Sequence, residues 1–187
     1  MEEYKSAIQK ALQFAVNKPK TPKKYHECHD KDPMTLPNTL INIGKIENPE
    51  VLQAAILHDI VECSNTTFEE VEKEFGKQVT SIVRELTPTE NGGNFKKPPE
   101  TTELSTAAKE ILLADHLVCL TAVDEKHKNL TDAEMARFRN TALEIEHYRG
   151  TNKEIEKMLD NLFKKRNISY PSAPKERKSF LFSKQEE

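Results

Sequence analysis

The sequence is poor in the features that mark membrane and exported proteins. Its 187 residues include no tryptophan, and only 6% of them are aromatic. No apolar stretch approaches the ~18 residues that a membrane-spanning helix needs. The first residues, Met-Glu-Glu-Tyr-Lys, lack both the basic and the apolar region of a signal peptide. We therefore expect a soluble cytosolic or nuclear protein, with the cytoplasm as the predicted location and no membrane partner.

Cysteine is scarce, and its spacing favours free thiols. The three cysteines, Cys28, Cys63 and Cys119, are odd in number and form no Cys-x-x-Cys pair. This usage is typical of a reducing compartment. Cys28 lies between His26 and His29, but the spacing is too tight for a zinc motif and no second pair follows.

Positive charge is not in excess. The formal net charge is −3 and the isoelectric point is about 6.1, so no basic field attracts nucleic acid. Lys and Arg form only short clusters at 18–24 and 164–166. We interpret both clusters as solvated loops and helix ends, and we expect no nucleic-acid partner.

Helical patterns dominate, and no useful segment alternates apolar and polar residues. Asn48 with Pro49 predicts one helix start, and three capping boxes begin at Thr67, Thr131 and Thr151. Gly76 and Gly150 predict helix ends. The expected helices cover 2–17, 38–46, 49–62, 67–76, 77–86, 103–123, 131–149 and 151–166. The pattern predicts an all-α bundle of six to eight helices.

The chain is long enough for one domain with a sizeable core, which we place at 1–168. Residues 88–101 hold three prolines and two glycines and are predicted to form a mobile loop. Residues 169–187 carry two prolines, many charges and no period. They are predicted to be a disordered polar tail, for which the sequence identifies no partner.

Ionisable residues interrupt two apolar runs. His58 and Asp59 stand in the run 54–62, and Asp115 stands in the run 111–118. Such groups are costly in apolar helices unless they are paired, hydrogen-bonded or bound to a metal. Spacing alone leaves two interpretations open, a metal site or a satisfied His–Asp hydrogen bond. An imidazole with carboxylates suits Mn²⁺, Fe²⁺ or Mg²⁺ better than structural zinc, and Glu62, one turn on, suits a general base.

Several segments together resemble one family. They are Ala-Ala-Ile-Leu-His-Asp-Ile-Val-Glu at 54–62, Thr-Thr-Phe-Glu-Glu-Val-Glu-Lys-Glu-Phe-Gly at 66–76, Leu-Ala-Asp-His-Leu at 113–117 and Arg-Gly-Thr-Asn at 149–152. The chain resembles the HD-superfamily hydrolases of guanosine tetraphosphate (ppGpp) from residue 2 to about 170. It is most similar to the small single-domain members related to the RelA/SpoT hydrolase domain.

The resemblance implies an all-α, single HD-domain helical bundle. It also implies Mn²⁺-dependent removal of the 3′-pyrophosphate from ppGpp, or of phosphate from a related nucleotide such as NADPH. On this basis the metal ligands are His58, Asp59 and Asp115, and the catalytic residue is Glu62. Lys31 and His116 are the remaining candidates for binding the substrate phosphates.

The departures from the family gather at this same site. The first metal ligand of the family is a histidine in Pro-Tyr-Ile-Asn-His-Pro-Ile-Gly, and alignment with residues 37–44 places Ile41 there. The family's acidic partner of the catalytic Glu becomes Cys63, an arginine before Lys31 becomes Asp30, and an arginine of the penultimate helix becomes Glu134. In Asp-Lys-Leu-x-Asn, the lysine becomes His116 and the asparagine Cys119.

These departures predict weak or absent metal binding and impaired activity, which makes the chain a pseudoenzyme candidate. Loss of a direct ligand should weaken the metal by more than the roughly 10–100-fold seen for indirect partners. A water, His26 or His29 is an alternative source of the missing ligand. The alternative function is a catalytically inactive descendant that acts as a binding or interaction protein, through its scaffold or through its tail.

Overall fold

The computed structural model describes residues 3–19, 32–87 and 104–168, and within these ranges it contains helices and no strand. The all-α prediction is confirmed. The elements are α1 Glu3–Val16, α2 Thr35–Asn42, α3 Pro49–Leu57, α4 Ile60–Cys63, α5 Phe68–Leu86, α6 Thr106–Lys126, α7 Asp132–Glu144, the 3₁₀ helix η1 Ile145–Tyr148 and α8 Lys153–Lys165. The predicted loop at 88–101, the tail at 169–187, and Lys31, His26, Cys28 and His29 lie outside the described residues.

Most helix starts lie where the capping residues predict them. The side chain of Asn48 accepts a hydrogen bond from the backbone of Val51, with Pro49 at the first helical position. The capping boxes of Thr67 and Thr131 are both complete. The third box is wrong by one residue. Asn152, a stronger cap than threonine, accepts from the backbone of Ile155, and its own N–H donates to Glu156.

Gly76 divides α5 as predicted. Its backbone has φ 84° and ψ 173°, so two helical segments meet there at a kink. The predicted helix at 38–46 instead spans Thr35–Asn42, and the one predicted to reach residue 149 ends as α-helix at Glu144 and continues as η1. Helix boundaries of this kind depend on tertiary contacts that the local pattern does not contain.

The predicted helix over 49–62 is wrong in one important respect. The structure ends α3 at Leu57, places a turn at 58–59 and begins α4 at Ile60. Asp59 has φ −104° and ψ 3°, in the sparsely occupied bridge region where many active-site residues lie. Its carbonyl accepts hydrogen bonds from the N–H groups of Glu62 and Cys63. The His-Asp doublet therefore sits at a break between two helices.

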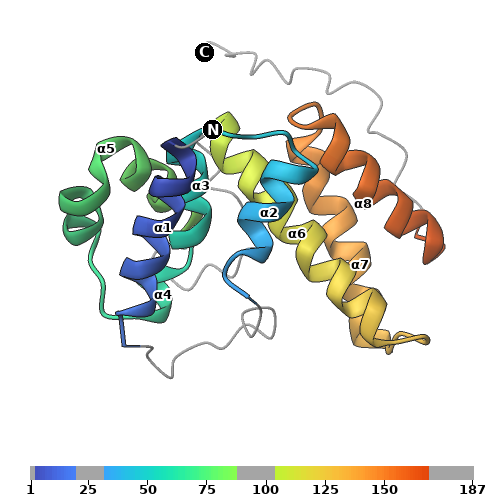
Figure 1. Cartoon of the computed structure of the whole chain (residues 1–187). Coiled ribbons are helices and arrows are strands. Elements are labelled where there is room, and N and C mark those ends of the chain that lie inside the picture. Colours follow the sequence, from blue (N-terminus) through green and yellow to red (C-terminus); the bar gives the residue numbers. More distant parts are fainter. Residues whose placement is uncertain (1–2, 20–31, 88–103, 169–187) are drawn as a thin grey trace, which may run out of the picture.

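Helix α6 runs through the middle of the bundle (Figure 1). Helices α1, α3 and α5 pack together on one side of it, α7 and α8 lie on the other, and α2 packs against both α3 and α6. The core is closed by fully buried Leu52 and Leu57 of α3, Leu113 and Leu120 of α6, and Phe138 of α7. This packing brings α3, which precedes the doublet, into contact with α6, which carries Asp115. None of the described helices has the length and apolar character to cross a membrane.

Candidate metal centre

The His58 side chain is held at both ring nitrogens. Nδ1 lies 2.8 Å from the carbonyl oxygen of Ala55, one turn earlier, and Nε2 lies 3.0 Å from Oδ2 of Asp59. The two side chains are only 19% and 16% exposed. When Nδ1 donates to a carbonyl, Nε2 is the nitrogen that faces a ligand, which is the usual arrangement of a metal-binding histidine.

Two carboxylates dominate the electrostatics of the imidazole. Burial alone lowers the pKa of His58, but the charge and hydrogen bond of Asp59 and the charge of Asp115 together raise it to about 9. The metal-free imidazole is therefore protonated at neutral pH, and its charge is balanced by the two carboxylates. A metal ion that binds here has to displace this proton.

Asp115 approaches the doublet from α6. Its carboxylate is close enough to raise the pKa of His58, and its Oδ1 accepts a hydrogen bond from the thiol of Cys119 over 3.8 Å. The structure thus places Asp115 near enough to His58 to act on its charge, but His58, Asp59 and Asp115 do not converge on one point as metal ligands within the described residues. Glu62 stays one turn away through its backbone bond to Asp59, and its side chain is half-buried.

The other predicted site residues lie elsewhere. Lys31 is outside the described residues. Nε2 of His116 is buried and lies 3.7 Å from Oε1 of Glu144 on α7. Glu144 in turn hydrogen-bonds Tyr148, whose pKa is raised mainly by burial and then by this carboxylate. Glu134 closes the capping box of α7 and lies 3.4 Å from His127. His116 is therefore in contact with α7 rather than with the doublet.

The donor atoms fit a divalent ion only in part. Two ligands bound at about 2.1 Å along perpendicular directions lie about 3.0 Å apart, which is the separation of His58 Nε2 and Asp59 Oδ2. Within the described ranges, however, no three His, Cys, Asp or Glu side chains converge closely enough to hold a metal ion. Ile41 of α2 packs against the core with an apolar side chain. The spacing of the His58–Asp59 doublet is compatible with a metal ion, but the described residues supply too few converging ligands to hold one.

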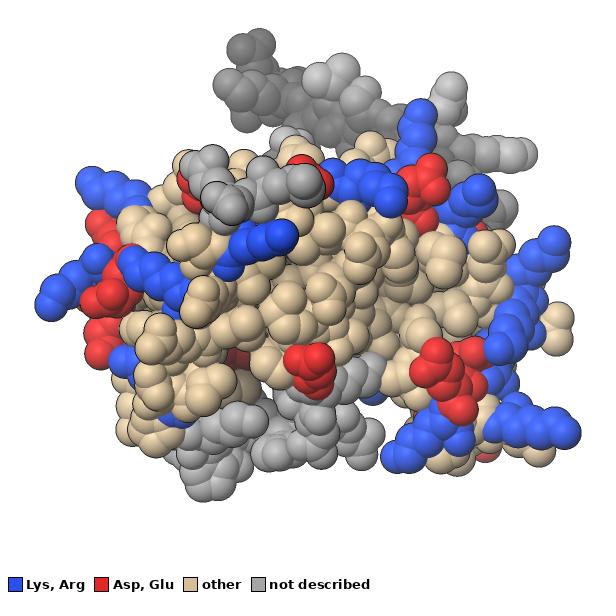
Figure 2. Space-filling model, viewed as in Figure 1, with Lys and Arg blue, Asp and Glu red and all other residues tan. Residues whose placement is uncertain are grey.

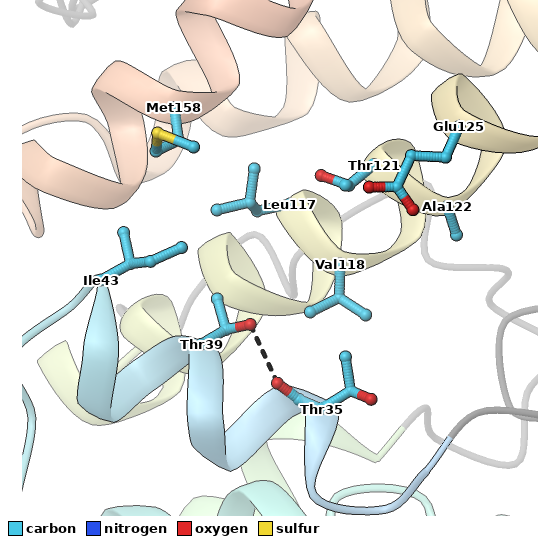
Figure 3. A pocket seen from close by; sticks show the side chains of 9 residues that line it. All are labelled: Thr35, Thr39, Ile43, Leu117, Val118, Thr121, Ala122, Glu125 and Met158. Carbon is cyan, nitrogen blue, oxygen red and sulfur yellow. Dashed lines mark hydrogen bonds between the residues drawn. The ribbon is translucent and has the colours of Figure 1, made fainter.

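A separate groove lies between α2, α6 and α8, with a cavity volume of about 370 Å³ (Figure 3). It is mainly apolar, and none of the predicted site residues lines it. Its lining residues are Thr35, Thr39, Ile43, Leu117, Val118, Thr121, Ala122, Glu125 and Met158. Figure 2 shows that charged side chains are sparse over the middle of this face of the molecule and gather at its margins.

Sequence reasoning missed a second ionic cluster. Asp124 on α6 is 8% exposed, and its carboxylate receives Lys165 Nζ at 2.6 Å and Arg166 Nε at 2.5 Å. The guanidinium of Arg166 also donates to the carbonyl oxygens of Asp124, His127 and Lys128. The interpretation of 164–166 as a solvated helix end is therefore wrong for Arg166. Its partner lies 42 residues away in the chain, and no local pattern contains that distance.

Comparison with known proteins agrees with this architecture. The sequence profile of the HD domain matches residues 11–145. The guanosine-3′,5′-bis(diphosphate) 3′-pyrophosphohydrolase MESH1 of Drosophila melanogaster is 30% identical, over 90% of this chain and 99% of its own length. The MESH1 protein of Xenopus tropicalis is 34% identical, over 73% of this chain and 80% of its own.

A solved structure of a metazoan ortholog of SpoT, described as hydrolysing ppGpp, superposes with a TM-score of 0.70. It shares 27% sequence identity, and the match covers 87% of this chain and 97% of that one. The resemblance seen in the sequence is thus confirmed at the level of the whole fold. The helical bundle, the His-Asp doublet at its helix break and these relatives together show that the chain belongs to the HD-domain family, among the MESH1-like proteins.

Proposed function

We propose that this chain is a divalent-metal-dependent pyrophosphohydrolase of guanosine 3′,5′-bis(diphosphate) or a similar nucleotide, with weak metal binding and reduced activity. The observation that carries the proposal is the spacing of His58 Nε2 and Asp59 Oδ2, with Nδ1 fixed by the carbonyl of Ala55. The named activity of the MESH1 relatives supports the choice of substrate. The odd number of cysteines and the lack of a Cys-x-x-Cys pair support the cytoplasm as the location.

His58, Asp59 and Asp115 are the residues that would hold the ion, for which we propose Mn²⁺. When bound, such an ion polarises a phosphoryl oxygen and lowers the pKa of a water. In the proposed reaction a water oxygen bonds to the phosphorus on the 3′ oxygen, and that P–O bond breaks. Glu62 accepts the proton of the water. The 3′ oxygen takes up a proton, and the products are guanosine 5′-diphosphate and pyrophosphate.

Reduced activity follows from what surrounds these residues. Ile41 offers no donor at the position aligned with the first ligand of the family, and it packs against the core. Lys31 remains as a cation for the phosphates and His116, on the α7 side of α6, as a further candidate, whereas Asp30 introduces repulsion where the family has an arginine. We propose that these exchanges weaken both metal and substrate binding.

A second candidate function is a catalytically inactive binding protein that keeps the HD scaffold. The observation that favours it is the absence, within the described ranges, of three donors converging on one point. In that case the His58–Asp59 pair acts as a buried ion pair between α3 and α4. The two candidates differ in one measurable property, which is whether the purified protein holds a divalent ion and turns over nucleotide.

The deciding experiment measures Mn²⁺ binding by titration calorimetry and pyrophosphate release from guanosine 3′,5′-bis(diphosphate), with phosphate release from NADPH alongside. Two variants separate binding from chemistry. Asp115→Ala should abolish metal binding, and Glu62→Gln should keep it while lowering kcat by about 10²–10⁴-fold. A wild-type protein that binds no Mn²⁺ and releases no product at high enzyme concentration would establish the inactive alternative.

A further inference from the structure

The groove between α2, α6 and α8 has no part in the proposed reaction. Its cavity of about 370 Å³ lies within the range of about 300–1,000 Å³ that is typical of ligand-binding pockets. Leu117 and Val118 of α6 lie along it, with Ile43 of α2 and Met158 of α8 on either side (Figure 3). The polar groups that line it are three threonine hydroxyls and the carboxylate of Glu125. The groove therefore suits apolar side chains that are accompanied by a cation.

Met158 makes one wall of the groove apolar and accessible. It is 43% exposed, and the other exposed large apolar residues of the described ranges, Val16 and Leu143, do not line the groove. A methionine side chain is flexible and polarisable, and its sulfur makes favourable contacts with aromatic rings. An exposed apolar side chain beside an apolar cavity enlarges the surface that a partner can bury. An aromatic partner is therefore well matched to this wall.

The chain leaves the domain close to one end of this groove. Helix α8 ends in a Schellman motif, in which Asn167 has φ 55° and the N–H of Ile168 donates back into the last turn of the helix. Ile168 is 8% exposed, so this end of the helix is fixed on the core. Arg166 pairs with Asp124, the neighbour of Glu125 on α6. The segment that follows Ile168 therefore starts near the Glu125 end of the groove.

The sequence after Ile168 contains one run of large apolar residues, Phe-Leu-Phe at 180–182. Residues 169–180 can extend over about 40 Å, whereas the groove follows α6 over about 12 Å, from Leu117 to Glu125. The run can therefore reach every part of the groove. A tether of this length gives an effective concentration on the order of 1 mM, so even a weak intrinsic affinity is enough to dock the run.

The charges beside the run complement that of the groove. Lys178 and Lys184 flank it, and no carboxylate lies within 177–184. Glu125 is the charged residue among those that line the groove, and it is exposed. Either lysine can therefore approach Glu125 while the aromatic rings contact Met158. The attraction between charges is modest at an exposed site, so burial of the rings supplies most of the affinity.

We propose that the Phe-Leu-Phe run at 180–182 docks in the groove between α2, α6 and α8 of the same chain. The composition of 169–187 predicts disorder for the tail as a whole, and the proposal concerns this run alone. Docking buries the rings against Ile43 and Met158 and joins α2 to α8 across α6. The groove is then an intrachain binding surface, separate from the candidate metal centre and independent of whether that centre holds an ion.

Cleavage by chymotrypsin, which cuts after aromatic residues and leucine, tests the proposal on the full chain. Met158→Lys places a charge in the groove, and Leu143→Lys makes the same change at an exposed apolar residue of α7 outside it. An effective concentration about ten times the dissociation constant leaves about one molecule in ten undocked, so loss of docking should raise the cleavage rate within 180–182 about tenfold. We expect this increase in Met158→Lys and an unchanged rate in Leu143→Lys. Thermal melting verifies that both variants are folded at the assay temperature.

Methyl NMR of protein labelled at methionine gives a readout that needs no change in the groove. The double variant Phe180→Ala/Phe182→Ala removes both rings of the run. The double variant Ser179→Ala/Ser183→Ala is the matched control at neighbouring positions. We expect the Met158 methyl resonance to shift in the first double variant, because the ring currents are lost, and to stay in place in the second.

Equal cleavage rates of wild type and Met158→Lys within 180–182 would overturn the proposal. A Met158 methyl resonance that stays in place when both rings are removed also contradicts it. Protection that grows with protein concentration, accompanied by dimers in light scattering, assigns the groove to the run of a second copy and overturns the intrachain contact.

Discussion

Helix α6 carries two aspartates with opposite surroundings. Asp124, near its C-terminal end, receives Lys165 and Arg166 at 2.6 and 2.5 Å, and the same guanidinium binds three carbonyl groups at the end of the helix. Asp115, in the middle, receives one thiol at 3.8 Å and acts on His58 through its charge. Within the described residues, the carboxylate of Asp124 is surrounded by donors, whereas that of Asp115 receives one weak donor.

The difference indicates that the Asp124 cluster stabilises the fold, whereas Asp115 belongs to the candidate functional site. The Asp124 cluster ties the end of α8 to the end of α6, and its groups satisfy one another, as a buried ionic cluster must to be stable. The Asp115 region keeps acceptor capacity that the described residues do not fill. Unfilled capacity of this kind is expected at functional sites, where a ligand from outside the chain completes the set. The four predictions below test this contrast.

The largest effect is expected from Arg166→Ala. This change leaves Asp124 buried with one exposed lysine as its partner and strips three carbonyl groups of their donor, so the free energy of unfolding should fall by about 3 kcal/mol. Denaturant titration measures it. Lys164→Ala, at an exposed neighbour on the same turn, is the control and should change stability by less than about 0.5 kcal/mol. Similar losses in both variants would show that the cluster contributes little.

Ile41→His should have the next largest effect. It tests the Asp115 region rather than the Asp124 cluster. If position 41 occupies the place of the missing ligand, an imidazole there should tighten Mn²⁺ binding by at least about tenfold, equivalent to about 1.4 kcal/mol. Turnover should recover less than binding does, because Asp30, Cys63 and Glu134 still differ from the family. Titration calorimetry and product release are measured on both forms. Tight Mn²⁺ binding and turnover by the wild type, unchanged in the variant, would refute the alignment of this segment.

A smaller effect is expected on the stability of the protein at low pH. Burial raises the pKa of Asp124, but Lys165 and Arg166 outweigh burial, so the pKa lies below its ordinary value of 3.8. A carboxyl group with a lowered folded-state pKa contributes stability that is complete above its unfolded-state value and is lost as the pH falls through the folded-state value. Stability should therefore fall below about pH 4, and Arg166→Ala should remove part of this dependence. Parallel pH profiles for the two proteins would contradict the assignment.

The smallest effect is expected from Asp115→Asn in metal-free protein. The change weakens one thiol contact and removes one of the two carboxylate charges beside His58. Because Asp59 remains 3.0 Å from the imidazole, the free energy of unfolding should fall by less than about 1 kcal/mol. Asp124→Asn makes the matched comparison, because it leaves Lys165 and Arg166 facing a neutral group, and should cost about 3 kcal/mol. Thermal melting in EDTA measures both. Equal losses would mean that Asp115 is as structural as Asp124.

Local chemistry predicted much of the fold. Asn48, Thr67 and Thr131 begin helices because a side-chain oxygen satisfies nearby N–H groups, and Gly76 interrupts one because it adopts a positive φ. These signals involve residues within four positions of one another, so a sequence contains them in full.

Features set by distant partners were not predictable in the same way. The charge that Asp115 exerts on His58 comes from another helix, and the ion pair of Arg166 is made with Asp124, 42 residues away. The doublet itself was recognisable because charge in an apolar run requires compensation. The hydrogen bond between His58 and the carbonyl of Ala55 was not, since it depends on side-chain direction in the folded chain.

At the Gly76 kink, the residue that can be accommodated is limited by the chirality of its Cα atom rather than by the size of its side chain. A methyl group added there meets nothing within 4 Å, so steric contact does not exclude alanine. The backbone angles, φ 84° and ψ 173°, are the mirror image of an extended conformation that ordinary L-residues adopt freely. An L-alanine at position 76 has to adopt a conformation that costs it about 1–3 kcal/mol. Its mirror image, D-alanine, matches the backbone as it stands and restricts the unfolded chain, so α5 contains one position where the opposite enantiomer is the better fit.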